Sequence, residues 1–329
     1  MPELDLAIPR TRLDRIRQGA TVIPTEPAVF RFTGPGALTC LQGLLTNDLV
    51  KPGGGSIVYG ALLTPKGMIV VDAWVLRADR DDVLTMIVPP GGRESAIELL
   101  RRSIPPRLAR VENLSDEWRV AWLVGGHAFH TLAQTELPMP ESAGRVIAAG
   151  AGDALIALAP ETAPFVALFA GPAAEVASLA GAVVSAGARE GDETDWHAAR
   201  ILGGWPALGV EIDERTLPQE VRYDEIGGVS YTKGCYTGQE TVARLHFRGH
   251  TNRELRGLVW NEEPPEGRAV LANGKEVGTV RSTLKLGDRT LGLALIRREI
   301  EPGGAVVAGG RQATVVPLPF ALETLEVGA

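Results

Sequence analysis

Cysteine is scarce in this chain of 329 residues, in which only Cys40 and Cys235 carry a thiol. Two cysteines cannot build a disulfide framework, and their separation matches no metal-binding or redox motif. They also exclude an iron–sulfur cluster that is held by four cysteines of this chain alone. We therefore expect two reduced thiols and no metal site.

Long apolar runs and common cofactor motifs are missing as well. No stretch approaches the roughly 18 apolar residues that could cross a bilayer, and the first residues lack an apolar core of signal-peptide length. No GxGxxG opens a helix after a strand, and neither GxxxxGK[ST] nor GxSxG occurs. Dinucleotide-binding, P-loop and hydrolase-elbow functions therefore lack support. The expectation is a soluble cytoplasmic protein without a membrane partner.

Positive charge is in short supply. The chain has 33 lysines and arginines against 40 aspartates and glutamates, a formal net charge of −7. General nucleic-acid binders carry a basic footprint for the phosphates, so this balance argues against direct nucleic-acid binding. A basic stretch over 244–256 leaves one alternative open, a module that contacts tRNA with a steep salt dependence.

Helical and strand patterns alternate over the first three quarters of the chain, which favours an α+β architecture. From about residue 253 the pattern changes to short β-rich runs, and Asn273-Gly274 is a type I′ hairpin signal. The length suits roughly two domains. We predict a first region over 1–248 and a C-terminal β-domain over 249–329, with a self-contained core that is compatible with a monomer.

The predicted elements near the candidate site residues are short. A strand over 28–33 leads into a helix, and strands over 57–64, 67–76 and 83–88 follow as hairpins. The helix is predicted from leucines at helical spacing, namely Leu38, Leu41, Leu44 and Leu45.

The octet KGCYTGQE at 233–240 places Cys235 in a polar, glycine-rich setting. The thiolate is the reactive form of cysteine, and positive charge nearby favours it. Lys233 lies two residues away, and Arg244 and Arg248 follow. The residues alone leave two alternatives open: a functional cysteine, or a glycine-rich turn in which Cys235 packs as a small hydrophobe.

Three further groups of polar residues interrupt apolar patterns. Asp72, in the strand GMIVVDAWVL, either faces water by alternation or points into a cavity with a raised pKa. Thr46-Asn47-Asp48 either ends the leucine helix or turns toward a pocket. His246 and His250 are four apart and could share one helical face, but no second carboxylate-bearing motif accompanies them.

The octet, continued by TVAR and by FRG…NR, resembles the signature of the YgfZ family of folate-binding proteins, which are relatives of the glycine-cleavage T protein. LQGLLTNDL at 41–49 is similar to that family's LQGQxTND segment, and LLTPKGMIVVD at 62–72 to its following strand. LPQEVRYDEIGGVSYTKGCY at 217–236 resembles the run that leads into the signature. The resemblance covers almost the whole chain.

This resemblance implies an α+β fold in which two mixed α/β subdomains surround a central channel and a C-terminal β-barrel closes one side. It implies a protein that binds tetrahydrofolate or a derivative and supports the maturation or repair of iron–sulfur proteins, and thereby tRNA modification. Its partners would be folate and iron–sulfur enzymes or assembly factors. The alternative is a folate-dependent aminomethyl- or methyltransferase of the T-protein type, so enzymatic activity is left open.

The resemblance also nominates site residues. Cys235 would be the functional thiol, and Asp72 matches an aspartate that assists one-carbon transfer in the T protein. In one respect the chain departs from the T protein, because Leu202 stands where that protein has a pterin-binding glutamate. The expected cofactor-binding residues are Gln42, Asn47, Asp48, Lys233, Gly234, Tyr236, Gly238, Gln239, Glu240, Arg244 and Arg248.

Overall fold

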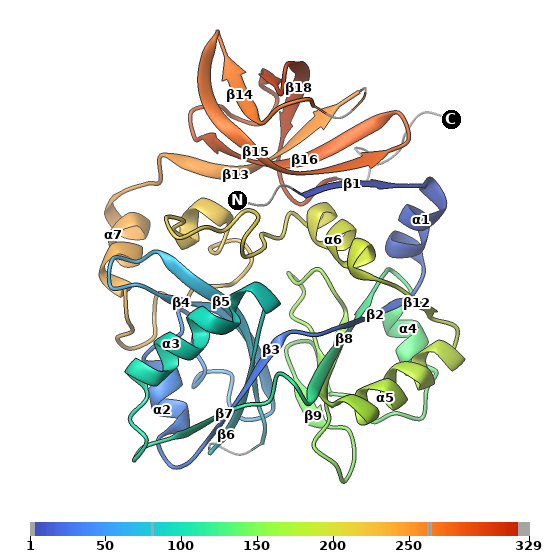
Figure 1. The fold of residues 1–329 in the computed structure, drawn as a ribbon, viewed down its shortest axis with the longest axis vertical. Helices are drawn as coiled ribbons and strands as arrows, with labels where there is room; N and C mark the ends of the chain where they lie inside the picture. Colours follow the sequence, from blue (N-terminus) through green and yellow to red (C-terminus); the bar gives the residue numbers. More distant parts are fainter. Residues whose placement is uncertain (1–3, 80–81, 262, 264, 322–329) are drawn as a thin grey trace.

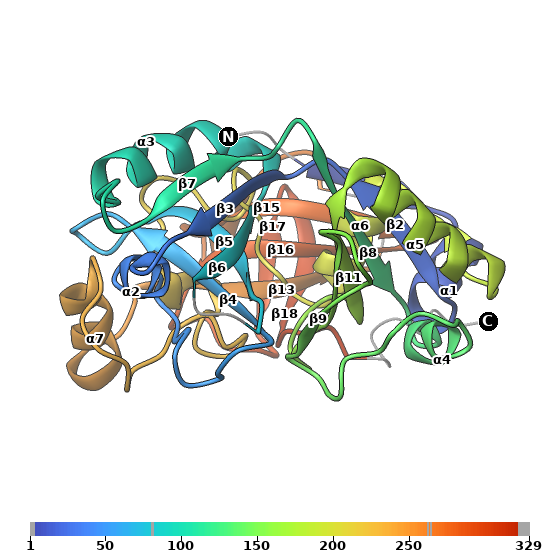
Figure 2. The same cartoon turned by 90° about the horizontal axis from the view of Figure 1, so that it is seen from below.

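Two α/β units lie side by side below a β-barrel in the computed structural model of the protein (Figures 1 and 2). The structure describes residues 4–79, 82–261, 263 and 265–321. Within this described part, no helix combines the length and the apolar character that a bilayer crossing requires.

The first unit is a five-stranded antiparallel sheet, with helices α2 (Ala37–Gln42) and α3 (Arg93–Ser103) packed against it. Its strands, in spatial order, are β4 (Ser56–Leu63), β5 (Ile69–Arg77), β6 (Val83–Val88), β3 (Ala28–Thr33) and β7 (Arg110–Asn113). All of β4 and nearly all of β5 are buried. Both faces of these strands are covered, which explains their almost continuous apolar sequence.

The second unit is a six-stranded sheet, against which α5 (Ala173–Ser185) packs. Its strands, in spatial order, are β12 (Arg189–Glu190), β2 (Thr21–Thr25), β8 (Trp118–Val124), β11 (Ala167–Pro172), β10 (Leu155–Leu158) and β9 (Val146–Ala148). The short helix α4 (Ala128–Ala133) follows β8. Because β2 belongs to this sheet and β3 to the first, the chain crosses between the two units within a few residues.

The barrel is a closed ring of six strands, in which the last strand pairs back with the first. Its strands, in order around the ring, are β15 (Lys275–Leu286), β14 (Ala269–Ala272), β17 (Ala305–Ala308), β18 (Arg311–Val316), β13 (Arg253–Trp260) and β16 (Arg289–Arg297). Near the other end of the chain, β1 (Leu4–Ile8) adds to β15 in parallel. Helix α1 (Arg10–Gln18) then leads from β1 into the second unit.

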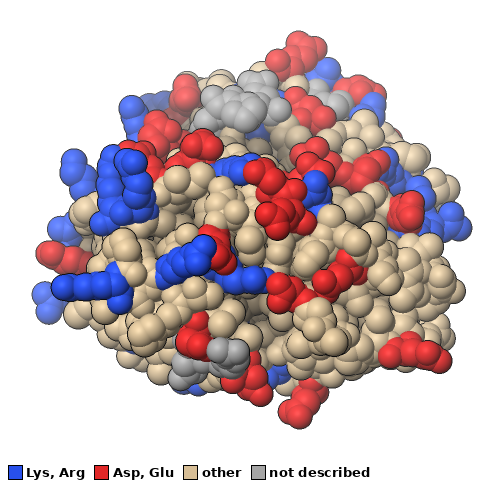
Figure 3. All heavy atoms as spheres, turned by 60° about the horizontal axis from the view of Figure 1, so that its bottom comes forward, with Lys and Arg blue, Asp and Glu red and all other residues tan. Residues whose placement is uncertain are grey.

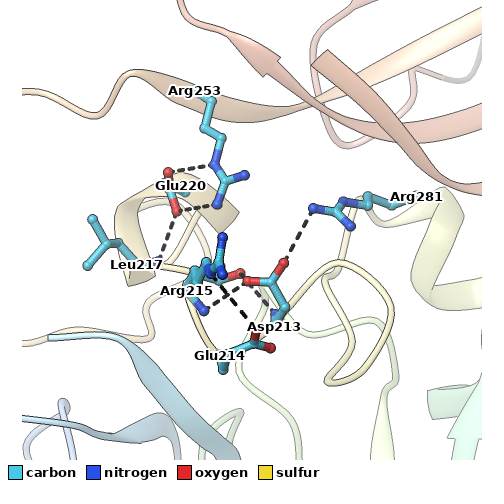
Figure 4. A network of polar contacts seen from close by, with 8 residues as sticks. Asp213, Glu214, Arg215, Leu217, Glu220, Arg253 and Arg281 are labelled. Atoms are coloured by element: carbon cyan, nitrogen blue, oxygen red, sulfur yellow. Dashed lines mark hydrogen bonds and ion pairs between the residues drawn. The ribbon is translucent and has the colours of Figure 1, made fainter. Parts of the chain in front are cut away.

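Charged side chains tie the barrel to the loop below it (Figure 4). Glu220, in the 3₁₀ turn η2 (Pro218–Val221), accepts a hydrogen bond from the Arg253 guanidinium at 2.7 Å. Arg281 of β15 contacts the Asp213 carboxylate at 3.4 Å. The loop carrying Asp213 and Glu220 also leads into helix α7 (Gln239–Arg248), so these contacts hold the segment containing the octet.

The α+β class with a C-terminal barrel is confirmed. Asn273 and Gly274 both have positive φ, as a type I′ turn requires. The predicted leucine helix is wrong at its end: α2 stops at Gln42, so Leu44 and Leu45 lie beyond it, and their N–H groups bond back to the Leu41 carbonyl. The division at 248/249 stays a prediction.

Candidate functional site

A cavity of about 790 Å³ is lined by residues of both sheets and of helix α6 (Glu193–Leu202). Four of the six tryptophans line it: Trp74, Trp122, Trp196 and Trp205. Trp74 stacks on Trp205 with 5.7 Å between ring centroids, and Trp122 stacks on Trp196 with 4.7 Å. The volume of this cavity falls in the range of about 300–1,000 Å³ that is usual for small-molecule sites. The flat aromatic side chains that line it suit a planar ligand.

Asp72 lines this cavity and is only 5% exposed. Its Oδ2 accepts a hydrogen bond from the Tyr59 hydroxyl at 3.0 Å, and that hydroxyl lies 3.1 Å from the hydroxyl of Tyr223. Asp72 Oδ1 has no hydrogen-bond partner among the described residues. Burial raises the pKa of Asp72 to about 6, although the Tyr59 hydrogen bond, the backbone N–H of Asp72 itself and the charge of Arg200 oppose this shift. Of the two alternatives for Asp72, the structure selects the cavity.

Arg200 of α6 lines the same cavity and is 1% exposed. Its Nη1 donates to the Glu211 carboxylate at 2.9 Å, and Glu211 in turn accepts from the Ser282 hydroxyl of the barrel at 2.6 Å. Its Nε donates to Nδ1 of His197 at 2.8 Å, so the neutral imidazole carries its proton on Nε2, which faces Glu193. Burial lowers the pKa of His197.

A second cavity of about 620 Å³ shares Trp74 with the first. Asn47, Asp48, Tyr59 and Tyr231 are among its lining residues. Tyr59 thus lines the second cavity, and its hydroxyl donates to the carboxylate of Asp72, which lines the first. The aromatic rings of Tyr59 and Trp74 lie 4.9 Å apart between centroids, and Trp74 lines both cavities.

The turn Thr46-Asn47-Asp48 joins strand β4 of the first unit to the segment before the octet. The Thr46 hydroxyl donates to the Gly228 carbonyl and accepts from the Ala61 N–H. The Asn47 amide donates to the carbonyls of Tyr59 and Gly227. The segments at 41–49 and 217–236, far apart in sequence, therefore lie against each other.

Gln42 and Asp48 complete this turn. Gln42 donates to Asp48 Oδ1 at 3.0 Å and accepts from the Leu49 N–H. Burial acts to raise the pKa of Asp48, but the N–H groups of Lys51 and Val50 that donate to its carboxylate, together with Gln42, bring the pKa below its usual value. Asp48 is therefore an ionised group at the wall of the second cavity.

Within the octet, Lys233 is a structural cation. Its ammonium donates to the carbonyls of Gln42, Leu45 and Asn47 at 2.6–2.9 Å, and its side chain is buried. Burial lowers the pKa of Lys233 to about 8, still above neutral pH. A cation is favoured at the carbonyl end of α2 by the helix dipole. Lys233 therefore binds the octet to α2 and to the turn after it.

Gly238 brings the octet onto the β4–β5 hairpin. It has φ +82°, and a Cβ atom at this position would lie 2.6 Å from the Thr64 carbonyl oxygen and 3.1 Å from Gly67 Cα. Only glycine fits this contact. Helix α7 begins at the next residue, Gln239, so Gly238 sets the direction in which α7 leaves the hairpin.

Two protein-family models and a solved structure are similar to this chain. The model of the GCVT N-terminal domain matches residues 14–144, and that of the CAF17 C-terminal β-barrel domain matches 255–320. The structure of glycine cleavage system aminomethyltransferase T from Bartonella henselae superposes with a TM-score of 0.78 at 19% identity, over 94% of this chain and 89% of that one.

Two relatives that match nearly the full length of this chain have the same name. "tRNA-modifying protein YgfZ" of Edwardsiella ictaluri is 28% identical over 305 residues, 89% of this chain and 90% of the relative. The protein of the same name from Cronobacter sakazakii is 26% identical over 328 residues, 96% and 97% of the two chains. The chain is a YgfZ-type, GcvT-like protein.

In this YgfZ-type protein, the predicted site residues do not all meet in one place. Asp72 lines the larger cavity, whereas Cys235 is exposed and lines neither cavity. The side chains of Gln42, Asn47 and Lys233 are engaged with the protein itself, so they build the frame of the site. Their role in cofactor binding stays a prediction.

The rest of the octet and α7 face outward or pack locally. Tyr236 is buried, with its ring 5.0 Å from the Lys233 ammonium. Gly234, Glu240, Arg244 and Arg248 are exposed, while Gln239 is half-buried. On the face drawn in Figure 3, acidic and basic side chains are interspersed, with a broad uncharged area at the lower right.

The expectation of one helical face for the two histidines is wrong. Helix α7 ends at Arg248, so His250 lies beyond it. His246 stacks on Tyr231 with 3.6 Å between ring centroids and lies 3.4 Å from Asp224. The glycine that follows Arg248 adopts an extended conformation and ends the helix.

Sequence reasoning missed most of the polar groups around the larger cavity. Arg200, His197, Tyr59 and Tyr223 were not predicted as site residues, although they surround Asp72. A signal was present in ETDWHAARIL, because positions 193, 196, 197 and 200 fall on one helical face. All four line the cavity.

Proposed function

We propose that this protein binds tetrahydrofolate or a derivative in the cavity around Asp72 and acts in the maturation or repair of iron–sulfur proteins, through which it affects tRNA modification. The observation that carries the folate part is a cavity of small-molecule size that is lined by four tryptophans and by the buried carboxylate of Asp72. The names of the full-length relatives support the part on tRNA modification.

The residues present fit a folate. Indole rings offer stacking surfaces for a pterin ring, and a buried carboxylate and guanidinium offer an acceptor and a donor for its polar edge. When bound, the folate would supply a carrier for a one-carbon unit. The chain itself would bind and orient the ring, exclude water from it, and hold or release a proton at Asp72.

Tetrahydrofolate is expected to quench the tryptophan fluorescence of the protein in a saturable manner. The reason is that four of the six tryptophans line the proposed site, so a bound pterin would lie close to most of the emitting rings. The measurement is an anaerobic titration corrected with free tryptophan as a control for absorption. A signal that never departs from that control would contradict folate binding.

Cys235 is proposed to act at the protein surface, where its thiol is accessible to a partner protein. Lys233 and Gly238 fix the loop that presents it, one through α2 and the other through the β4–β5 hairpin. A rigidly held, exposed thiol suits exchange of sulfur or electrons with an iron–sulfur client.

Replacing Cys235 with serine is expected to reduce the iron–sulfur enzyme activities of a complemented deletion strain to the level of the deletion itself. The change removes the thiol chemistry and leaves an exposed position without a packing role. The matched control is Cys40→Ser, a change of the other cysteine, which lies in α2, packs against the apolar core of the first unit and is expected to complement. Full complementation by Cys235→Ser would show that the thiol is not required and would contradict this part of the proposal.

The second candidate function is a folate-dependent aminomethyl- or methyltransferase, favoured by the buried carboxylate of Asp72. With its pKa near 6, this group exchanges a proton close to neutral pH, as an acid or base in catalysis must. Formation of methylenetetrahydrofolate from tetrahydrofolate and an aminomethyl donor would distinguish this function from binding alone.

A further inference from the structure

Helix α7 presents two arginines and a phenylalanine at the periphery of the molecule, on the outer side of the first unit (Figures 1 and 2). Val242 is the one buried residue of this helix, so α7 rests on the protein through a single side. Arg244, Phe247 and Arg248 are all exposed. Their spacing of three and four residues places them on one helical face, which we call the α7 stripe.

Phe247 is 66% exposed, more than any other large apolar side chain in the described part of the chain. A single exposed apolar residue is ordinary on a protein surface, but this ring is held in place. It packs edge-on against the His246 ring at 4.8 Å and the Tyr231 ring at 5.9 Å between centroids. A ring that is already ordered loses little conformational freedom when a partner covers it. Phe247 therefore suits the role of an anchor in an interface, where phenylalanine and arginine are enriched.

The two arginines make the α7 stripe positive. Neither Arg244 nor Arg248 forms an ion pair with another described residue, and the same holds for Lys66, which is exposed in the turn between β4 and β5. This turn lies against α7, because a Cβ atom on Gly67 would be 2.8 Å from a side chain in the first turn of the helix. Glu240 is the one exposed carboxylate of α7. Three unpaired cations against one carboxylate select a partner surface that is acidic.

The exposed thiol of Cys235 falls within the area that one partner would cover. The backbone between Cys235 and Glu240 spans at most about 18 Å, and the helix from Glu240 to Arg248 is about 12 Å long. The thiol-bearing residue and the far end of the α7 stripe are therefore at most about 30 Å apart. A standard interface covers roughly 800 Å² of each partner, a disc about 32 Å across. A protein that docks on the α7 stripe thus also approaches Cys235.

We propose that the α7 stripe is the docking site for an acidic surface of the protein partner of Cys235. Phe247 is the apolar anchor, and Arg244 and Arg248 pair with carboxylates of the partner around it. This inference rests on the proposed role of Cys235 toward an iron–sulfur protein, and it adds the surface that holds this partner. RNA is the less favoured occupant, because a polyanion would meet the net charge of −7 of the whole chain.

The test places the photo-crosslinking amino acid p-benzoylphenylalanine at position 247 of the full chain, expressed in the deletion strain. Irradiation is expected to join the chain to an iron–sulfur protein or assembly factor, which mass spectrometry of the purified adduct identifies. Arg244→Glu combined with Arg248→Glu is expected to lower the adduct yield at least about tenfold, because like charges would then face each other. Lysine at both positions keeps the charge and is expected to keep most of the yield. The matched control is the same amino acid in place of Phe129, a ring of α4 that is 54% exposed and is expected not to form this adduct.

The molecule that is joined to position 247 decides between the occupants of the α7 stripe. No adduct, or an adduct with RNA, with a second copy of this chain or with a protein that neither holds nor assembles an iron–sulfur cluster, would overturn the proposal. An unchanged yield in a charge-reversed variant whose melting curve shows that it is folded would contradict the acidic partner surface. If the expected adduct forms while Cys235→Ser complements fully, the docking site stands and the proposed role of the thiol fails.

Discussion

Replacing Glu211 with alanine is expected to destabilise the protein by about 3–5 kcal/mol, the usual cost of removing one partner of a buried ion pair. Glu211 is fully buried and accepts from Arg200, from the Ala207 N–H and from the Ser282 hydroxyl. Its loss would leave the Arg200 charge buried without a counter-ion and the barrel hydroxyl without its acceptor. The measurement is the free energy of unfolding from urea denaturation.

Two controls separate the buried charge from ordinary contacts. Glu98→Ala removes an exposed partner of Arg102 on α3, and the change is expected to stay within about 0.5 kcal/mol. Ser282→Ala removes only the hydroxyl that reaches Glu211, and a loss of about 1 kcal/mol is expected. A Glu211→Ala variant as stable as Glu98→Ala would show that Arg200 finds another partner and that the pair does not hold α6 to the barrel.

The fold was predictable where local patterns determine it. The barrel region shows short β-rich runs and an Asn-Gly turn, and each of these signals needs only neighbouring residues. Strand β1 was not predicted, because LDLAI is short and joins the sheet only by pairing with β15, far away in the sequence. The end of α2 depends in the same way on Lys233, which contacts the carbonyl of its last residue, Gln42, and those of Leu45 and Asn47 after it, across more than 180 residues.

The site residues, too, could be predicted only where a local pattern indicated them. Asp72 could be singled out because a carboxylate in an apolar strand is locally anomalous. Lys233 was expected to bind a cofactor and to favour a thiolate, yet its ammonium is engaged with three carbonyls. Which polar groups surround Asp72 depends on how α6 packs against the first unit, and no local pattern contains that information. The one local hint of Arg200 and His197 was the helical face of α6 that holds positions 193, 196, 197 and 200.

Replacing Asp72 with asparagine is expected to stabilise the protein at pH 8 and to leave its stability nearly unchanged at pH 4. Burial raises the folded-state pKa of Asp72 to about 6, above the ordinary value of about 4. The stabilisation linked to this carboxyl is therefore complete below about pH 4 and is lost as the pH rises through 6. Roughly two pKa units correspond to about 3 kcal/mol, which the neutral amide would recover at pH 8.

The measurement is urea denaturation of the wild-type protein and the variant at both pH values, with Asp153→Asn, a change of an exposed carboxylate, as the control. The control is expected to stay within about 0.5 kcal/mol of the wild-type protein. A more stable Asp72→Asn protein that also binds tetrahydrofolate poorly would mean that the carboxylate is kept for its ligand at the expense of stability. A variant that is less stable at pH 8 would instead make Asp72 a structural acceptor for the Tyr59 hydroxyl, and the case for a ligand group at this position would fail.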